Sequence, residues 1–404
     1  MSDADRSPPD DGEGSSELDR ELEPHLAVGA RVVADRPSDG IGAPIELLEE
    51  ELHTKSTTRR IVEALVSLAV TVAMFALVIP KLFDTEYRDV FAALGRLDGL
   101  AVVGLFAFWI ASMWTYWVFQ ARSLPGLTVP QSGVLNLSGS AVSNVVPFGG
   151  AVGIGATYAQ TMSWGFRPVE VTRSILVSGV WNVFSKLGFP ILALLAVNLR
   201  GDDDHGLGIA AWIGLAILVG AIVVFWLIMR SQVLAEKVGD AAQAVVGFGL
   251  RVARRPAQES VKQKVLDFRA ESVDLVRRRW LGLTVWIGLY KVSSFLLQLL
   301  CVRALGIDEL GWVYVLAAYT FGELLTTVPL TPSGVGLVEA GSAGIMVAFG
   351  APEADALAAV FLFRAFTYVL EVPAGAIGWA IWAAKSSWRK PQPATGVDAA
   401  PSVG

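Results

Sequence analysis

The chain has little of what soluble enzymes and metalloproteins are built from. Only 17% of its 404 residues are charged, whereas 53% are hydrophobic. This balance excludes an ordinary soluble globule and is typical of a polytopic membrane protein. The single cysteine, Cys301, excludes an intramolecular disulfide. Because all three histidines, His25, His53 and His205, lie outside the apolar runs, we expect no metal site in the membrane and no cofactor.

Further absences bear on the energy source and the partners. The sequence has no Gly-x-x-x-x-Gly-Lys-Ser/Thr loop, which excludes ATP hydrolysis of that type on this chain. The basic segment 231–279 also carries acidic residues, so we expect no nucleic-acid partner. Its apolar residues recur at helical spacing, which favours a position on the inner membrane surface. Since the apolar runs contain neither histidine nor a paired acidic motif, we expect that the chain is not an enzyme.

Long apolar runs predict an all-α helical bundle that crosses the membrane several times. A helix needs roughly 20 apolar residues to cross the hydrocarbon. The runs that meet this requirement are residues 61–83, 98–121, 169–198, 207–230, 280–305 and 355–385. Two more apolar regions, 131–164 and 311–349, are interrupted by proline and glycine.

Lysine and arginine near the ends of the spans predict the orientation. Basic residues before the first span, within 231–279 and after the last span place these segments in the cytoplasm. We therefore expect a multi-pass protein of the cell membrane with both termini cytoplasmic. Residues 1–55 have the composition of a disordered acidic tail, and residues 391–404 are expected to form a second one. The transmembrane domain is then 56–390.

The two interrupted regions resemble each other. The first contains Asn144, Pro147 and Gly149, and the second contains Pro332 and Gly334. A shift of 185 residues superposes Pro147 on Pro332 and Gly149 on Gly334. Both copies have the same layout, in which an apolar helix precedes the break and a long apolar helix follows it.

Loop charges place the two copies in opposite orientations. Residues 131–164 must begin and end inside, whereas 311–349 must begin and end outside. We predict an inverted-topology repeat, residues 98–198 and 280–385, in which each copy contains a Pro/Gly-broken re-entrant hairpin. Each broken region could instead cross as two short helices, because two crossings restore the same side and leave the loop charges unchanged.

Ionisable side chains in the spans are candidate functional groups, because charge is costly inside a bilayer. Lys186 and Glu371 are also 185 residues apart, near the middle of their spans, which predicts an ion pair across the repeats with either a structural or a site role. Arg364 could pair with Glu339 or bind a lipid phosphate. Glu339 could receive a cation or proton, or merely satisfy Arg364. The remaining ionisable candidates are Lys291 and Glu323.

A family resemblance rests on the C-terminal motif. The run Pro329-Leu-Thr-Pro332-Ser-Gly334-Val-Gly336-Leu-Val-Glu339, followed by Phe363-Arg364 and Thr367-Tyr368, resembles the signature of the lysylphosphatidylglycerol synthase transmembrane-region family. That family is similar to the flippase part of the multiple peptide resistance factor. The resemblance covers roughly residues 60–385 and implies a flippase-like domain. It implies that the site contains Pro332, Gly334, Gly336, Glu339, Arg364 and Tyr368.

The resemblance implies translocation of a phospholipid or a polyprenyl-phosphate-linked lipid between leaflets. Only a short polar segment follows the last span, so we expect the soluble aminoacyl-transfer domain, and with it lipid synthesis, to be absent. Two alternatives stay open, an ion-coupled secondary transporter of a small solute and a non-transporting membrane scaffold. We expect membrane lipids as partners and leave open a homo-oligomer and a partner enzyme of lipid or cell-envelope synthesis. The predicted site is completed by Lys186, Glu371, Asn144, Pro147 and Gly149.

Overall fold

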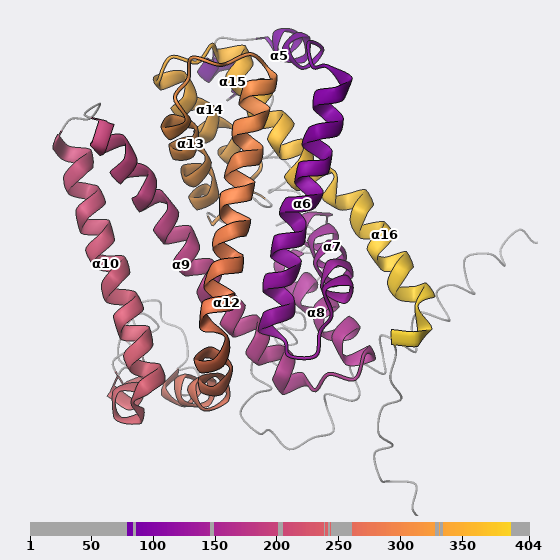
Figure 1. The fold of residues 1–404 in the computed structure, drawn as a ribbon, viewed down its shortest axis with the longest axis vertical. Coiled ribbons are helices and arrows are strands. Elements are labelled where there is room, and N and C mark those ends of the chain that lie inside the picture. The colour runs from indigo at the N-terminus through magenta and orange to yellow at the C-terminus, as the bar shows by residue number, and fades with distance from the viewer. Residues whose placement is uncertain are drawn as a thin grey trace, which may run out of the picture. The chain divides into compact units, whose positions relative to one another are not determined.

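The computed structural model is all-helical over the residues that it describes. These are residues 79–83, 86–145, 149–200, 205–237, 239–240, 243, 261–327, 331 and 334–388, all within one compact unit, Pro44–Gly404. No strand occurs in these ranges, which confirms the predicted all-α class (Figure 1). The two predicted tails, most of the predicted first span and much of the basic segment 231–279 lie outside the described residues.

Five helical stretches are long and apolar enough to cross a membrane, so the chain is a multi-pass membrane protein. They are Gly99–Ser123, Pro168–Leu199, Trp212–Arg230, Ser272–Ala304 and Glu353–Ala384. The complete order is α4 (Ile79–Phe83), α5 (Tyr87–Leu94), α6 (Gly99–Ser123), α7 (Val129–Val145), α8 (Gly149–Ser163), α9 (Pro168–Arg200), α10 (His205–Arg230), α12 (Val261–Ala304), α13 (Trp312–Leu325), α14 (Leu337–Ala348), α15 (Glu353–Arg364), a π-helical turn (Ala365–Val369), α16 (Glu371–Ala384) and a 3₁₀ turn (Ser386–Trp388).

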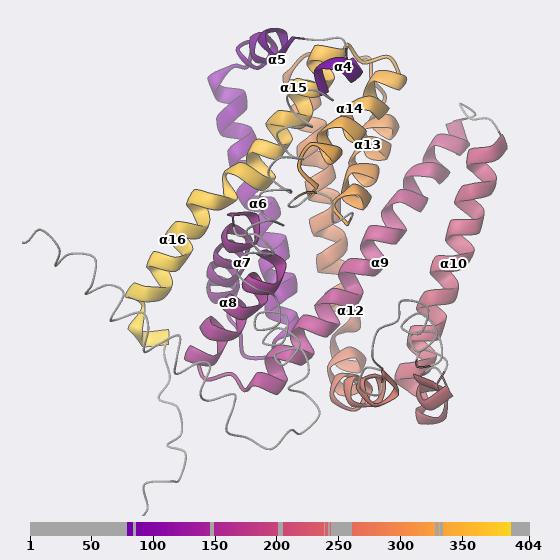
Figure 2. The same ribbon diagram turned by 180° about the vertical axis from the view of Figure 1, so that it is seen from behind.

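The two interrupted regions form two helical hairpins, α7–α8 and α13–α14. In Figures 1 and 2 the first hairpin occupies the lower half of the bundle and the second occupies the upper half. Their packing is reciprocal. Helix α7 packs on α16, helix α13 packs on α9, and the long helices α6 and α12 pack on each other. Each hairpin therefore leans on the long helix that ends the other half of the chain.

The same turn follows both hairpins. Gly165 and Gly350 have φ angles of 87° and 96°, in the left-handed region that favours glycine. Behind each, two backbone hydrogen bonds close the helix end, from Phe166 N to Thr161 O at 3.2 Å and from Ala351 N to Met346 O at 3.0 Å. This is the glycine-terminated helix end known as the Schellman motif. The predicted equivalence of Gly165 and Gly350 thus extends to their backbone geometry.

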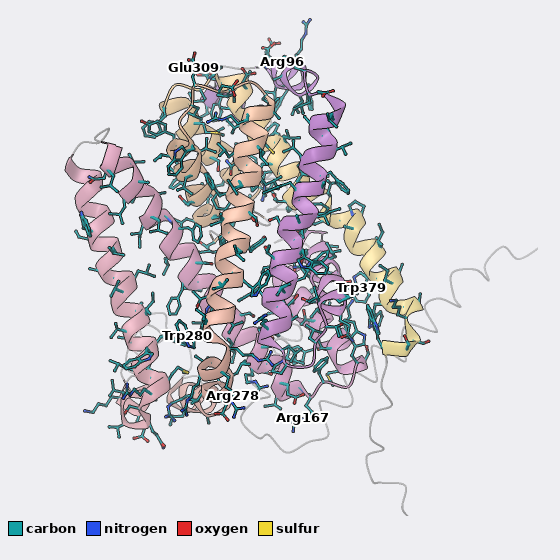
Figure 3. The ribbon with its side chains drawn as sticks, viewed as in Figure 1. Arg96, Arg167, Arg278, Trp280, Glu309 and Trp379 are labelled. Carbon is teal, nitrogen blue, oxygen red and sulfur yellow. The ribbon has the colours of Figure 1, made fainter. Side chains whose placement is uncertain are left out.

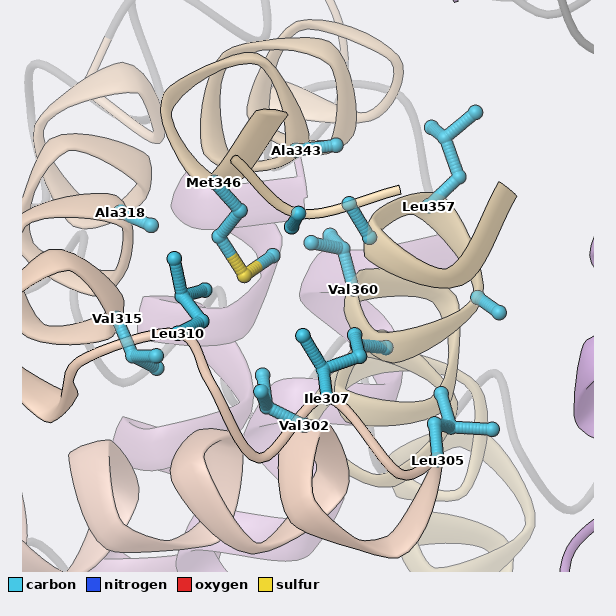
Figure 4. Packing of buried hydrophobic residues seen from close by; sticks show 14 of the residues in the cluster. Val302, Leu305, Ile307, Leu310, Val315, Ala318, Ala343, Met346, Leu357 and Val360 are labelled. Carbon is cyan, nitrogen blue, oxygen red and sulfur yellow. The ribbon is translucent and has the colours of Figure 1, made fainter. Parts of the chain in front are cut away.

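A buried apolar cluster fixes the second hairpin against the last span (Figure 4). Met346 of α14 and Val315 of α13 are fully buried, as is Val302 near the end of α12, and Val360 of α15 is 1% exposed. Close packing of this kind leaves side chains few alternative positions. It therefore holds the start of α14 at a set distance from the end of α15, where the charged residues of the candidate site lie.

Helices α7 and α16 approach each other at glycines. A Cβ atom added to Gly375 would lie 2.1 Å from the Cβ of Ala141 and 2.5 Å from the carbonyl oxygen of Leu137. One added to Gly378 would lie 2.9 Å from Oγ of Ser138. Small residues allow this backbone approach between membrane helices, which associate through close packing rather than through the hydrophobic effect.

Candidate functional site

The candidate site begins at the second break, where α14 starts. Gly334 and Gly336 have φ angles of 69° and 88°, so the chain can turn sharply into the helix. The Oε2 atom of Glu339 accepts a hydrogen bond from the backbone N–H of Gly336 at 2.6 Å. Its Oε1 atom accepts one from Nε of Arg364 at 2.7 Å. Glu339 thus satisfies both the free helix start and the buried guanidinium, as one of the two sequence interpretations predicts.

Arg364 continues this network toward the first hairpin. Its guanidinium carbon lies 4.9 Å from the centre of the Tyr368 ring, a cation–π distance. The Tyr368 hydroxyl donates a hydrogen bond to the backbone carbonyl of Asn144 at 3.0 Å. The Asn144 side-chain amide in turn donates to Oε2 of Glu371 at 3.4 Å. A chain of polar contacts therefore joins the start of α14 to the end of α7 through the last span.

A second charged cluster lies on the other side of the break. Nζ of Lys186, on α9, donates a hydrogen bond to Oγ1 of Thr326 at 2.9 Å, just after α13. Lys291 of α12 forms an ion pair with Glu323 of α13. Lys291 is only 4% exposed. Burying a charge is tolerated when it is paired and hydrogen-bonded, so this ion pair stabilises the contact between α12 and α13 in its present geometry.

The predicted ion pair between Lys186 and Glu371 is wrong. No ion pair joins them in the part of the chain that the structure describes, because each contacts the hairpin of the other repeat instead. Lys186 reaches Thr326 beside the second break, and Glu371 reaches Asn144 beside the first. Equivalent positions make equivalent contacts here, which is a different arrangement from contacting each other.

A polar cavity of about 110 Å³ lies between these two clusters. Its wall includes Arg364, Glu371 and Glu323, which come from α15, α16 and α13. Gln298 is 1% exposed, and its amide nitrogen donates no hydrogen bond to any other described residue. The sequence analysis missed the α12 contribution to this wall and several of its other members, which are Tyr290, Ser294, Gln298, Tyr319, Ser342 and Thr367.

The remaining predicted site residues have different outcomes. Pro147 and Pro332 lie outside the described residues. Gly149 is the first residue of α8, as a break before it requires. In the described ranges, no three or more His, Cys, Asp and Glu side chains lie together so that they could hold a metal ion. The site therefore offers charged and hydrogen-bonding groups in a small cavity rather than a metal centre.

Comparison with known families agrees with this architecture. No curated protein matches the chain. A family model, described as the lysylphosphatidylglycerol synthase TM region, matches residues 64–375. The match includes both hairpins and the charged residues of the site, and it confirms the resemblance read from the C-terminal motif. The chain belongs to the lysylphosphatidylglycerol synthase TM region family.

Proposed function

We propose that this protein translocates a phosphate-bearing lipid, a phospholipid or a polyprenyl-phosphate-linked lipid, between the leaflets of the cell membrane. The observation that carries the proposal is the position of Arg364. Its guanidinium lines the polar cavity and is oriented by Glu339 and the Tyr368 ring. A planar guanidinium matches a phosphate with paired hydrogen bonds. Membership of the family, together with the apolar helices, fits a membrane protein of lipid metabolism or transport.

The proposal includes an inverted repeat with two re-entrant hairpins. Its support is the reciprocal packing of α7 on α16 and of α13 on α9. Discontinuous helices that face each other near the bilayer midplane are the usual site of substrate binding in transporters with inverted repeats. In this arrangement the two breaks approach the cavity from opposite sides, and both termini of the chain are cytoplasmic.

Cysteine labelling tests this topology in a Cys301→Ser background. Arg167→Cys and Glu309→Cys lie in exposed turns at opposite ends of the bundle (Figure 3). A bulky impermeant reagent should label them from opposite sides of the membrane. Thr327→Cys, beside the second break, should not react from the side that labels Arg167→Cys. Labelling of Thr327→Cys from that side would show that the region crosses the membrane as two short helices.

A specific observation favours a second candidate, an ion-coupled transporter of a small solute. The polar cavity of about 110 Å³ is well below the roughly 300 Å³ at which ligand pockets usually begin. A cavity of this size suits a small polar solute better than a lipid headgroup. For lipid translocation, the α13–α14 hairpin and the last span must therefore separate during the cycle.

Arg364→Lys tests the role of the guanidinium. Lysine keeps the charge next to Glu339 but loses the planar fork, so we expect lipid movement to fall about tenfold, the equivalent of one charged hydrogen bond. The measurement is the rate at which a fluorescent phospholipid changes leaflet in proteoliposomes, with folded protein quantified in parallel. Arg96→Lys, at an exposed arginine away from the cavity, is the matched control and should move lipid at the wild-type rate.

The same vesicles separate the two candidate functions. Wild-type protein that moves no phospholipid or polyprenyl-phosphate lipid faster than empty vesicles, yet accumulates a small solute under a proton gradient, would replace the first candidate with the second. We further propose that the chain moves lipid without altering it chemically. Mass spectrometry of lipid recovered from the vesicles checks this, because a modified headgroup would reveal a catalytic step.

A further inference from the structure

A much larger cavity lies away from the polar one, between α9, α10 and α12. Its volume is about 1000 Å³, and none of its wall residues belongs to the polar cavity. Most of the wall is apolar. Aromatic contacts line up on one side, where the Phe225 ring lies 5.8 Å from Trp181 and 5.5 Å from Phe184. The other apolar members are Phe189, Leu192, Ile222, Met229, Val273, Val276 and Ile287.

Three arginines converge on one end of this apolar cavity. Arg230 ends α10, while Arg269 and Arg277 come from the first part of α12. Arg269 is held in place, because its Nε donates a hydrogen bond to the carbonyl oxygen of Ile228 at 2.9 Å. Arg230 and Arg277 are exposed. No acidic side chain lines the cavity, so these positive charges face an apolar space without a counter-charge in its wall.

Two tryptophans mark the level of the arginines in the membrane. Trp226 and Trp280 both line the cavity and are 52% and 54% exposed. Trp280 lies near Arg278 at the lower end of the bundle in Figure 3. Exposed tryptophan is enriched at the membrane–water interface. The arginines are therefore at headgroup level, and the cavity runs from them into the hydrocarbon, with Gly288 about 16 Å along α12 from Arg277.

We propose that this cavity binds one anionic phospholipid. The phosphate and the anionic headgroup contact Arg230, Arg269 and Arg277, and an acyl chain lies against Phe184, Phe225 and Leu192. Charge at one end and an apolar wall along the rest match the two parts of such a lipid, and basic pockets between membrane helices bind acidic headgroups for the same reason. This site is distinct from the Arg364 cavity, so its lipid is a resident ligand whether or not the protein translocates lipid.

The headgroup contact is tested with the full chain purified in detergent. Native mass spectrometry measures the retention of phosphatidylglycerol and of phosphatidylcholine with the same acyl chains. We expect the wild type to prefer phosphatidylglycerol at least tenfold. The double variant Arg230→Gln/Arg277→Gln should lose most of this preference. Arg278→Gln, an exposed neighbour that does not line the cavity, is the matched control and should keep it.

The acyl-chain contact is tested by filling the cavity. A Cβ added to Gly288 meets no atom within 4 Å, so Gly288→Leu projects into open space without a backbone clash. It should reduce the retention of both lipids about tenfold. Gly220→Leu adds the same side chain to α10, also with no atom within 4 Å, at a position that does not line the cavity. Equal retention of phosphatidylglycerol by Gly288→Leu and Gly220→Leu, or an unchanged preference in the double arginine variant, would overturn the proposal.

Discussion

Glu339→Ala is expected to lower the free energy of unfolding by about 3–5 kcal/mol, the usual cost of removing one partner from a buried ion pair. Glu339 is 3% exposed and binds both Arg364 and the N–H of Gly336. Alanine removes the carboxylate from Arg364 and the cap from α14 in one step. Reversible unfolding in mixed detergent micelles, followed by tryptophan fluorescence, measures the loss.

Two further variants identify the cause of this loss. Glu339→Gln retains an acceptor for the Gly336 N–H but not the charge, so it should fall between the wild type and Glu339→Ala. Glu309→Ala removes an exposed glutamate and should change the free energy of unfolding by no more than about 0.5 kcal/mol. A loss in Glu339→Ala no larger than that in Glu309→Ala would show that the ion pair does not hold α14 against the last span.

Glu323→Gln should have an effect of similar size, about 3–5 kcal/mol, because it leaves the ammonium of Lys291 buried without its carboxylate. The double variant Glu323→Gln/Lys291→Met removes both charges and should recover most of the loss, since apolar groups of similar volume can replace a buried pair. The same unfolding measurement applies to both variants.

An exposed ion pair provides the comparison for this cycle. Arg167 is 74% exposed in its pair with Glu170, so Arg167→Gln should cost less than about 1 kcal/mol. If the two changes in Glu323→Gln/Lys291→Met are simply additive, the ion pair contributes no coupling, and α12 and α13 are held together by their apolar contacts alone.

The membrane spans were predictable because hydropathy reports a single dominant cost, that of placing polar backbone and side chains in hydrocarbon. The predicted run 98–121 is helix α6, and 207–230 is helix α10 within a few residues. The predicted run 280–305 falls short, because helix α12 begins at Val261. Residues 261–279 are too polar to be recognised by hydropathy, yet they continue the same helix.

The charged contacts were only partly predictable. The pair of Arg364 with Glu339 could be proposed because both follow the glycine break at short separation. The error about Lys186 and Glu371 has a geometric cause. Sequence equivalence relates two positions by a symmetry operation, and such positions touch only when they lie on its axis. A sequence does not give the distance from that axis, whereas it does give the equivalence of the two environments.

A usable signal for the missed part of the cavity wall was present in the sequence. Tyr290, Ser294 and Gln298 recur every four residues in an otherwise apolar span, so they share one helix face. A polar stripe on a membrane helix predicts that this face is turned away from lipid. What the spacing could not show is which of the neighbouring helices provides the opposite wall, because that depends on how the hairpins pack.

The glycine contact between α7 and α16 determines which parts of the molecule can move separately. Where two backbones touch at Gly375 and Ala141, no layer of side chains lies between them that could change rotamer and let them slide or tilt. The first hairpin and α16 therefore behave as one rigid body. Any opening of the polar cavity must take place at the opposite wall, where α13 and α14 meet the last span through larger side chains such as Tyr319 and Phe363.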